Sequence, residues 1–185
     1  VVLIDYGTKK NIIRELNKRG CNVAVVPYNT KAQDILSLNP DGIMLSNGPG
    51  DPKENVEAIE ELKKLFGNVP IFAICLGHQL LALSQGGETT KLKYGHRGVN
   101  QPVKNLETGR TYISSQNHGY AVVNEEIEKT GAKVSYINAN DGTCEGVDYP
   151  GKNAFSVQFH PEACSGPHDT RFIFDKFIEM MGGNK

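Results

Sequence analysis

The chain has 185 residues, a formal net charge of −1, 38% hydrophobic residues and 22% charged residues. These values are ordinary for one globular domain with a substantial core. Basic residues are scattered, which gives no support for a nucleic-acid or anionic-membrane partner, and no apolar run approaches the length of a membrane-spanning helix. The four cysteines have neither paired spacing nor a CxxC motif, which favours a reducing compartment, so we expect a cytoplasmic protein.

The first half of the chain alternates short apolar runs with amphipathic segments. Continuous apolar runs are typical of parallel strands buried on both faces, and amphipathic segments are typical of the helices that cover them. The expected strands are residues 1–6, 23–26, 42–45 and 71–75, and the expected helices are residues 8–19, 30–38, 55–66 and 76–84. We expect Thr8 to cap the first helix and Gly20 to end it.

The second half predicts short strands joined by turns and a final helix. The strand segments are 99–104, 111–114, 120–123, 134–138 and 154–159, and part of them should extend the sheet in antiparallel fashion. Residues 169–181 predict a helix, because Phe174, Phe177, Ile178 and Met181 follow core-facing helical spacing. The predicted fold class is therefore α/β, a three-layer open and mostly parallel sheet with helices on both faces and a small antiparallel extension.

Cys75 lies where an apolar run ends and a helical pattern begins at Leu76. A side chain at such a turn projects from the carboxyl edge of a parallel sheet, where open α/β folds bind ligands. The positive end of the following helix favours the thiolate, which is the reactive form of cysteine. Gly77 permits a tight turn. The alternative is a buried structural cysteine, since free cysteine is among the most buried residue types.

His160 and Glu162 end another apolar run and are separated by Pro161. In an extended segment, residues two apart point to the same side. Glu162 can then accept a hydrogen bond from one imidazole nitrogen while the other nitrogen faces the thiol of Cys75. The three residues predict a nucleophile, a base and an orienting carboxylate. The alternative is a strand-end histidine beside a solvated glutamate.

Two polar loops are further candidates for the site. Residues 46–52, Ser-Asn-Gly-Pro-Gly-Asp-Pro, follow the third expected strand, and their backbone N–H groups suit an oxyanion hole. This loop is not a P-loop, because it lacks Gly-Lys-Ser/Thr. Residues 114–120, Ser-Ser-Gln-Asn-His-Gly-Tyr, lie between two expected strands and suit substrate recognition. A surface turn and a hairpin turn are the respective alternatives.

The remaining histidines carry weaker signals. His118 has no neighbouring carboxylate in the sequence and is therefore not expected to be the base. We expect His78 to be a structural hydrogen-bonding residue, His96 to lie in a loop over residues 95–98, and His168 to help begin the last helix. Ligand spacing disfavours a zinc site made of Cys75, His78 and His160.

Taken together, these motifs resemble the class I glutamine amidotransferases, which use a Cys-His-Glu triad. The resemblance is carried by residues 74–79, Ile-Cys-Leu-Gly-His-Gln, by His160-Pro161-Glu162 and by residues 46–52, in this order. Residues 5–12, 95–103, 116–122 and 166–170 narrow it to the glutaminase domain of carbamoyl-phosphate synthetase small subunits, rather than to the anthranilate- or GMP-synthase amidotransferases.

The resemblance implies a flavodoxin-like fold with one glutaminase domain over residues 1–181 and a tail over residues 182–185. It also implies that the amino-terminal domain of the subunit lies outside this sequence. By resemblance, Cys75 is the nucleophile, His160 the base and acid, and Glu162 its orienting group. The implied oxyanion-hole donors are the backbone N–H groups of Gly48 and Leu76. The implied substrate-binding residues are Gly48, Gly50, Leu76, Gln79, Asn117, Gly119 and Tyr120.

The implied activity is hydrolysis of glutamine to glutamate and ammonia through a γ-glutamyl thioester. The implied partner is a large synthetase subunit that makes carbamoyl phosphate, a precursor of pyrimidines and arginine, from bicarbonate, ATP and the ammonia. ATP and magnesium would belong to that partner, and the resemblance implies no metal or other cofactor in this chain. Three alternatives stay open: an amidotransferase subunit of another synthetase, a stand-alone γ-glutamyl cysteine hydrolase, and a non-catalytic binding module.

Overall fold

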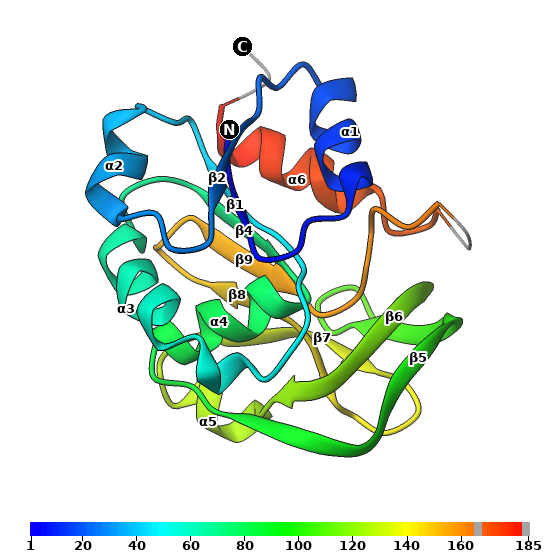
Figure 1. The fold of residues 1–185 in the computed structure, drawn as a ribbon. Coiled ribbons are helices and arrows are strands. Elements are labelled where there is room, and N and C mark those ends of the chain that lie inside the picture. Colours follow the sequence, from blue (N-terminus) through cyan, green and yellow to red (C-terminus); the bar gives the residue numbers. More distant parts are fainter. Residues whose placement is uncertain (165–167, 183–185) are drawn as a thin grey trace.

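The computed structural model describes residues 1–164 and 168–182, which form an α/β fold around one mixed sheet (Figure 1). The strands are β1 (Val2–Asp5), β2 (Ala24–Pro27), β3 (Ile43–Leu45), β4 (Ile71–Ile74), β5 (Thr89–Asn105), β6 (Thr111–Val122), β7 (Lys133–Asn138), β8 (Cys144–Tyr149) and β9 (Ala154–Val157). Their order in the sheet is β2-β1-β3-β4-β9-β8-β7-β5-β6. The strands from β2 to β9 in this order are parallel, and each neighbouring pair from β9 to β6 is antiparallel. The predicted fold class is confirmed.

Helices cover both faces of the parallel part of the sheet (Figure 1). The helical elements are α1 (Lys10–Lys18), α2 (Ala32–Ser37), the 3-10 turn η1 (Pro52–Glu54), α3 (Val56–Leu65), α4 (Leu76–Ser84), α5 (Asn124–Glu128) and α6 (Phe172–Met180). Alternate residues of the strands point to opposite faces. Leu3, Met44 and Phe72 therefore pack against α1 and α6, whereas Ile4 and Leu45 pack in the cluster that contains α2, α3 and α4.

The start of α1 differs from the sequence prediction because of Asp5 at the end of β1. The Asp5 Oδ1 atom accepts hydrogen bonds from the amides of Gly7 and Thr8 and from the Thr8 hydroxyl, at 2.8 to 2.9 Å. The Thr8 hydroxyl is thereby used in the β1–α1 turn and does not cap the helix. The N-cap position is Lys9, which makes no side-chain cap bond. The prediction of Thr8 as the cap was wrong.

The second half of the chain is more regular than its sequence predicted. Residues 99–104 form only the end of the long strand β5, and residues 111–114 and 120–123 belong largely to one continuous strand, β6. The polar segment 114–120 is therefore part of a strand and not a turn, and its register with β5 shifts at two irregularities. The sequence prediction missed β8 and α5. The strand β8 was not predicted because two acidic residues and a glycine interrupt the apolar pattern of its segment, Cys-Glu-Gly-Val-Asp-Tyr.

The final helix α6 begins at Phe172, three residues later than predicted. Phe174 and Phe177 are fully buried, as their spacing predicted, and Met181 lies at the C-cap. The predicted tail lies outside the described residues except for its first residue, and so do residues 166 and 167 of the motif before this helix. Within the described part of the chain, no helix combines the length and the apolar composition that a bilayer crossing requires.

Candidate active site

Cys75 occupies a sharp turn between β4 and α4, with φ 54° and ψ −105°. Positive φ is unfavourable for a residue with a Cβ atom and persists only where the surroundings impose it. The Cys75 amide donates to the carbonyl of Val157 in β9, and the Gly77 amide donates to the carbonyl of Ser46 after β3. A Cβ atom at Gly77 would lie 2.7 Å from the Leu45 carbonyl oxygen. Only glycine therefore lets the first turn of α4 pack this closely on β3.

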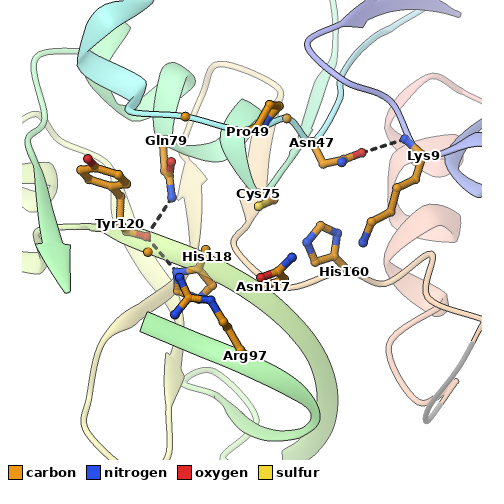
Figure 2. Close-up of a pocket in the computed structure, with 13 residues that line it drawn as sticks. Lys9, Asn47, Pro49, Cys75, Gln79, Arg97, Asn117, His118, Tyr120 and His160 are labelled. Carbon is orange, nitrogen blue, oxygen red and sulfur yellow. Dashed lines mark hydrogen bonds between the residues drawn. The ribbon is translucent and has the colours of Figure 1, made fainter. Parts of the chain in front are cut away.

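His160 and Glu162 follow β9, the parallel neighbour of β4, so they reach the same edge of the sheet as Cys75. The His160 Nδ1 atom is 2.7 Å from Glu162 Oε1, and both side chains are buried. A carboxylate can only accept, so Nδ1 carries the proton and Nε2 is left for the thiol side of the ring. Figure 2 shows the ring of His160 and the sulfur of Cys75 facing the same space. The structure brings the three predicted residues together.

The electrostatics of this group follow from burial and from the two side chains next to His160, Cys75 and Glu162. Burial disfavours the imidazolium, but the side chains of Cys75 and Glu162 outweigh it and raise the pKa of His160 to about 9. Burial also disfavours the Glu162 carboxylate, yet the hydrogen bond from His160 holds its pKa below the ordinary value. Lys9 contributes in the same direction, with its Nζ atom 3.6 Å from Glu162 Oε1. His160 and Glu162 therefore form an ion pair of an imidazolium and a carboxylate.

A cavity of about 360 Å³ opens above Cys75 and His160 (Figure 2). Its lining residues are Lys9, Asn47, Gly48, Pro49, Gly50, Cys75, Gln79, Arg97, Asn117, His118, Gly119, Tyr120 and His160. They come from the β1–α1 turn, the loop after β3, the start of α4, the β5–β6 ribbon and the end of β9. The Gln79 amide nitrogen donates to the Tyr120 carbonyl and to Gln158 Oε1, both at 2.8 Å, and so ties α4 to the ribbon.

All the site residues predicted from the sequence line this cavity except Glu162 and Leu76. Glu162 lies behind the His160 ring, and Leu76 is buried in the first turn of α4. Gly48 packs so tightly on the carbonyl of Tyr6 that a Cβ atom there would collide with it. At Gly48 the loop over residues 46–52 therefore approaches the cavity as bare backbone.

Lys9, Asn47 and Arg97 line the cavity but were not singled out as site residues from the sequence. Asn47 Oδ1 accepts from the Lys9 amide at 3.0 Å, and its amide nitrogen donates to the Gly7 carbonyl at 3.0 Å. These bonds join the turns that follow β1 and β3. A usable signal existed for Lys9 and Asn47, because both follow parallel strands, whose carboxyl ends meet at one edge of the sheet.

The expectation that His118 has no neighbouring carboxylate was wrong. Glu145 of β8, distant in sequence, places its Oε1 atom 3.8 Å from His118 Nε2. The other ring nitrogen, Nδ1, lies 2.8 Å from the Tyr120 carbonyl. Burial lowers the pKa of His118 to about 4. His118 is therefore a neutral ring held in the cavity wall, and His160 is the histidine that is paired with a buried carboxylate and lines the cavity beside Cys75.

His78 is a structural residue, as predicted. Its Nδ1 atom lies 2.8 Å from the hydroxyl of Ser156, and complete burial lowers its pKa to about 3. The His78 ring is therefore hydrogen-bonded to β9. Within the described residues, Cys75, His78 and His160 do not form a metal-ligand group. The ligand atoms that do cluster belong to His96, His118 and Glu145.

The comparisons with known proteins give the family of the chain. Residues 2–180 match the family model for glutamine amidotransferase class-I. The chain belongs to the class I glutamine amidotransferase family. It is 59% identical over 181 residues to the carbamoyl phosphate synthase small chain of Bacillus cereus, covering 98% of this chain and 50% of that protein.

Other relatives and a solved structure extend the comparison. The carbamoyl phosphate synthase small chain of Listeria monocytogenes is 56% identical over 185 residues, covering all of this chain and 51% of that protein. The chain thus spans about half the length of these curated relatives. A crystal structure of a putative GMP synthase protein from Thermoplasma acidophilum has a TM-score of 0.84, with 22% identity and coverage of 98% of this chain and 92% of that chain. At that identity it supports the fold alone.

Proposed function

We propose that this chain hydrolyses glutamine to glutamate and ammonia through a γ-glutamyl thioester on Cys75. The observation that carries the proposal is the arrangement of Cys75, His160 and Glu162. A cysteine on a strained turn shares a cavity with an imidazole whose far nitrogen is fixed by a buried carboxylate at 2.7 Å. Such an arrangement provides a nucleophile, a general base and an orienting group.

In the proposed reaction, the Cys75 sulfur attacks the carboxamide carbon of glutamine and His160 Nε2 holds the thiol proton. The tetrahedral intermediate places negative charge on oxygen, and we assign its stabilisation to the amides of Gly48 and Leu76. Neither amide donates to an acceptor in residues 1–164 and 168–182. One such donor is typically worth about 3 to 4 kcal/mol in the transition state. Transfer of the proton from His160 to nitrogen releases ammonia and leaves the thioester.

The second half of the reaction returns the enzyme to its starting state. His160 Nε2 takes a proton from water, the resulting hydroxide attacks the thioester carbon, and collapse of the intermediate expels the sulfur with that proton. Throughout, Glu162 holds Nδ1 in the protonated tautomer. The steps use side chains and backbone of this chain alone.

We assign glutamine recognition to Gly50, Gln79, Asn117, Gly119 and Tyr120, together with Gly48 and Leu76. The support is their position on the cavity wall beside Cys75, or next to it in the chain. The amides and free backbone groups of this wall offer donors and acceptors of the kind that an amino acid and a carboxamide require.

We further propose that the ammonia goes to the large subunit of a carbamoyl-phosphate synthase in the cytoplasm. The support is the identity to small chains of that name over the whole length of this chain, and four cysteines that are all free. Bicarbonate, ATP and magnesium would be bound by the large subunit.

Replacement of Cys75 by serine tests the proposal. Glutamine hydrolysis by the assembled complex should vanish, whereas synthesis from added ammonia should continue. A glutamine-like alkylating agent followed by mass spectrometry should label Cys75 and spare Cys21, Cys144 and Cys164. Labelling of another thiol, or loss of ammonia-dependent synthesis together with glutamine hydrolysis, would contradict the proposal.

A further inference from the structure

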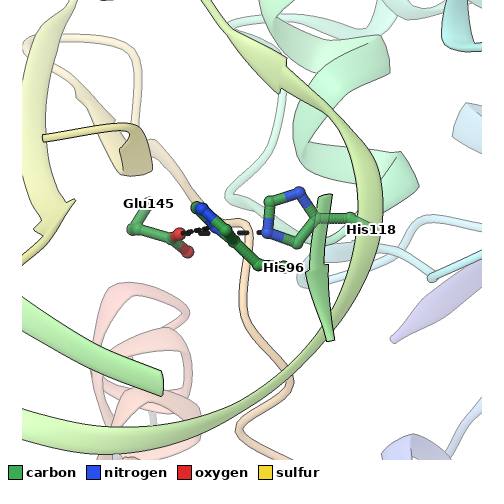
Figure 3. A group of neighbouring side chains, drawn as sticks. All are labelled: His96, His118 and Glu145. Atoms are coloured by element: carbon green, nitrogen blue, oxygen red, sulfur yellow. Dashed lines mark hydrogen bonds and ion pairs between the residues drawn. The ribbon is translucent and has the colours of Figure 1, made fainter. Parts of the chain in front are cut away.

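Three side chains from different strands converge behind the wall of the cavity (Figure 3). His96 comes from β5, His118 from β6 and Glu145 from β8. Glu145 Oε1 is 3.2 Å from His96 Nδ1 and 3.8 Å from His118 Nε2, and the candidate ligand atoms all lie within 4.8 Å of one another. His118 and Glu145 are buried, and His96 is mostly covered. None of the steps proposed above uses this group.

In each imidazole, the nitrogen that points away from Glu145 already has a hydrogen-bond partner. His96 Nε2 is 2.8 Å from the Asp141 carboxylate, and His118 Nδ1 is 2.8 Å from the Tyr120 carbonyl. Both partners accept hydrogen bonds, so these two nitrogens carry the protons of the neutral rings. His118 Nε2 then presents a lone pair toward Glu145, and His96 Nδ1, which lies 3.2 Å from Glu145 Oε1, does so once its own proton is released. An imidazole that donates its other N–H to a carboxylate or a carbonyl is the usual form of a metal-ligating histidine.

The Glu145 carboxylate, at the centre of the group, has one oxygen without a hydrogen-bond partner among the described residues. Glu145 is fully buried, and its Oε2 atom makes no hydrogen bond within the described part of the chain. His118 Nε2 faces a second acceptor as well, Gln116 Oε1 at 3.0 Å. Lone pairs turned toward one another in a buried space repel unless a proton or a metal cation lies between them.

We propose that His96 Nδ1, His118 Nε2 and the Glu145 carboxylate form a binding site for a divalent transition-metal ion of the Zn²⁺ type. Zinc takes imidazole and carboxylate ligands at about 2.0 to 2.2 Å, which in tetrahedral geometry separates neighbouring ligand atoms by about 3.3 Å. The 3.2 Å separation fits this value, and the 3.8 Å separation needs a shift of about half an ångström. Water would complete the coordination on the side where His96 reaches the surface.

A proton competes with the ion for the same lone pairs. A metal ion needs the unprotonated His96 Nδ1, so metal binding releases the proton that this nitrogen otherwise shares with Glu145 Oε1 at 3.2 Å. The bound ion would tie β5, β6 and β8 together and fix the His118 ring, whose Nδ1 holds the carbonyl of Tyr120 in the cavity wall.

Binding of Co²⁺, a coloured substitute for Zn²⁺, tests the site independently of any glutaminase activity. The titration uses the Cys75→Ser protein at mildly alkaline pH, with a chromophoric chelator as competitor. We expect one Co²⁺ per chain, with the visible bands of a nitrogen and oxygen site and without a sulfur-to-metal charge-transfer band. His96→Gln and Glu145→Gln should each weaken binding by at least about 100-fold, and Asp141→Asn, which removes the outer partner of His96, by about 10- to 100-fold.

Asp148→Asn is the matched control, because Asp148 lies on the same strand as Glu145 and pairs with Lys176 instead. Its Co²⁺ affinity should equal that of the unmodified chain. If Glu145→Gln does not fold, as judged by circular dichroism, the Co²⁺ affinities of the His96→Gln and Asp141→Asn variants, which change more accessible residues, test the site. Absence of stoichiometric binding, a thiolate charge-transfer band, or unchanged affinity in the His96 and Asp141 variants would overturn the site and leave the group as a protonated imidazole between two carboxylates.

Discussion

The Glu162→Gln substitution should slow the proposed glutaminase reaction by about 10²- to 10⁴-fold in kcat while leaving KM nearly unchanged. Glutamine has the shape of glutamate, so the cavity keeps its form, and Glu162 does not line it. The substitution removes the charge that faces His160 Nδ1 at 2.7 Å. It also allows an amide N–H to point at Nδ1, which favours the tautomer with its proton on the thiol side.

The lower limit of this range comes from the electrostatics of His160. Its pKa is raised from 6.5 to about 9 against the opposing effect of burial. That rise corresponds to about 3 kcal/mol of preference for the imidazolium, or a factor of roughly 10² in its population. Cys75 and Glu162 supply this preference together against burial. With Glu162 neutral, Cys75 alone must offset burial, and the imidazole is also free to adopt the wrong tautomer. The upper limit is the loss known when a triad carboxylate becomes an amide and the imidazole adopts the wrong tautomer.

The assay is glutamate release, with the rate of Cys75 alkylation by a glutamine-like electrophile as a second readout where turnover is slow. Glu15→Gln is the matched control, since Glu15 is also buried but pairs with Lys18 and Arg19 far from the cavity. That variant should lose stability and keep its kcat. A loss below about threefold in Glu162→Gln, or an equal loss in Glu15→Gln, would refute the assigned role of the carboxylate.

Three further predictions concern the scaffold. Gly77→Ala should lower the free energy of unfolding by about 1 to 3 kcal/mol, because the added Cβ would lie 2.7 Å from the backbone of Leu45. Urea titration measures this change, and an unchanged free energy of unfolding would contradict the tight packing at Gly77. Phe72→Ala should cost about 3 to 5 kcal/mol, since the ring is fully buried against three other phenylalanine rings; a loss below about 1 kcal/mol would contradict this packing. Because the folded-state pKa of His160 is raised above 6.5 to about 9, its imidazolium stabilises the fold fully below pH 6.5, and this contribution disappears as the pH rises through about 9. The difference in unfolding free energy between the unmodified chain and His160→Asn should shrink over that range, and a difference independent of pH would contradict the shift.

The parallel half of the fold was predictable from the sequence because the hydrophobic pattern of each element is visible within its own residues. Buried parallel strands are continuous apolar runs, and the helices between them carry one apolar stripe, so hydrophobic pattern alone located β1, β3, β4 and α4 within one or two residues. The Cys75 turn was predictable for the same reason, since a strand and a helix meet there without a linker.

The antiparallel half was less predictable because its pairing is not local. The strand β5 is largely exposed and polar, β6 carries polar residues at both buried and exposed positions, and the two are held by cross-strand bonds that a hydrophobic pattern does not report. The pairing of His118 with Glu145 likewise depends on β8, a strand that the sequence did not reveal. Glu145 was missed because its strand was not detectable.

The meeting of Cys75 with His160 depends on the register of two strands rather than on the loops that follow them. In the β4–β9 pair, Ile74 lies opposite Val157, and the Cys75 amide donates to the Val157 carbonyl. A slip of one residue would move His160 by about 3.3 Å along the sheet and turn alternate side chains to the other face. The stacked rings of Phe72 and Phe155, which are register partners at 4.6 Å, resist such a slip from within the core. The same aromatic packing that stabilises the fold therefore fixes the distance between nucleophile and base.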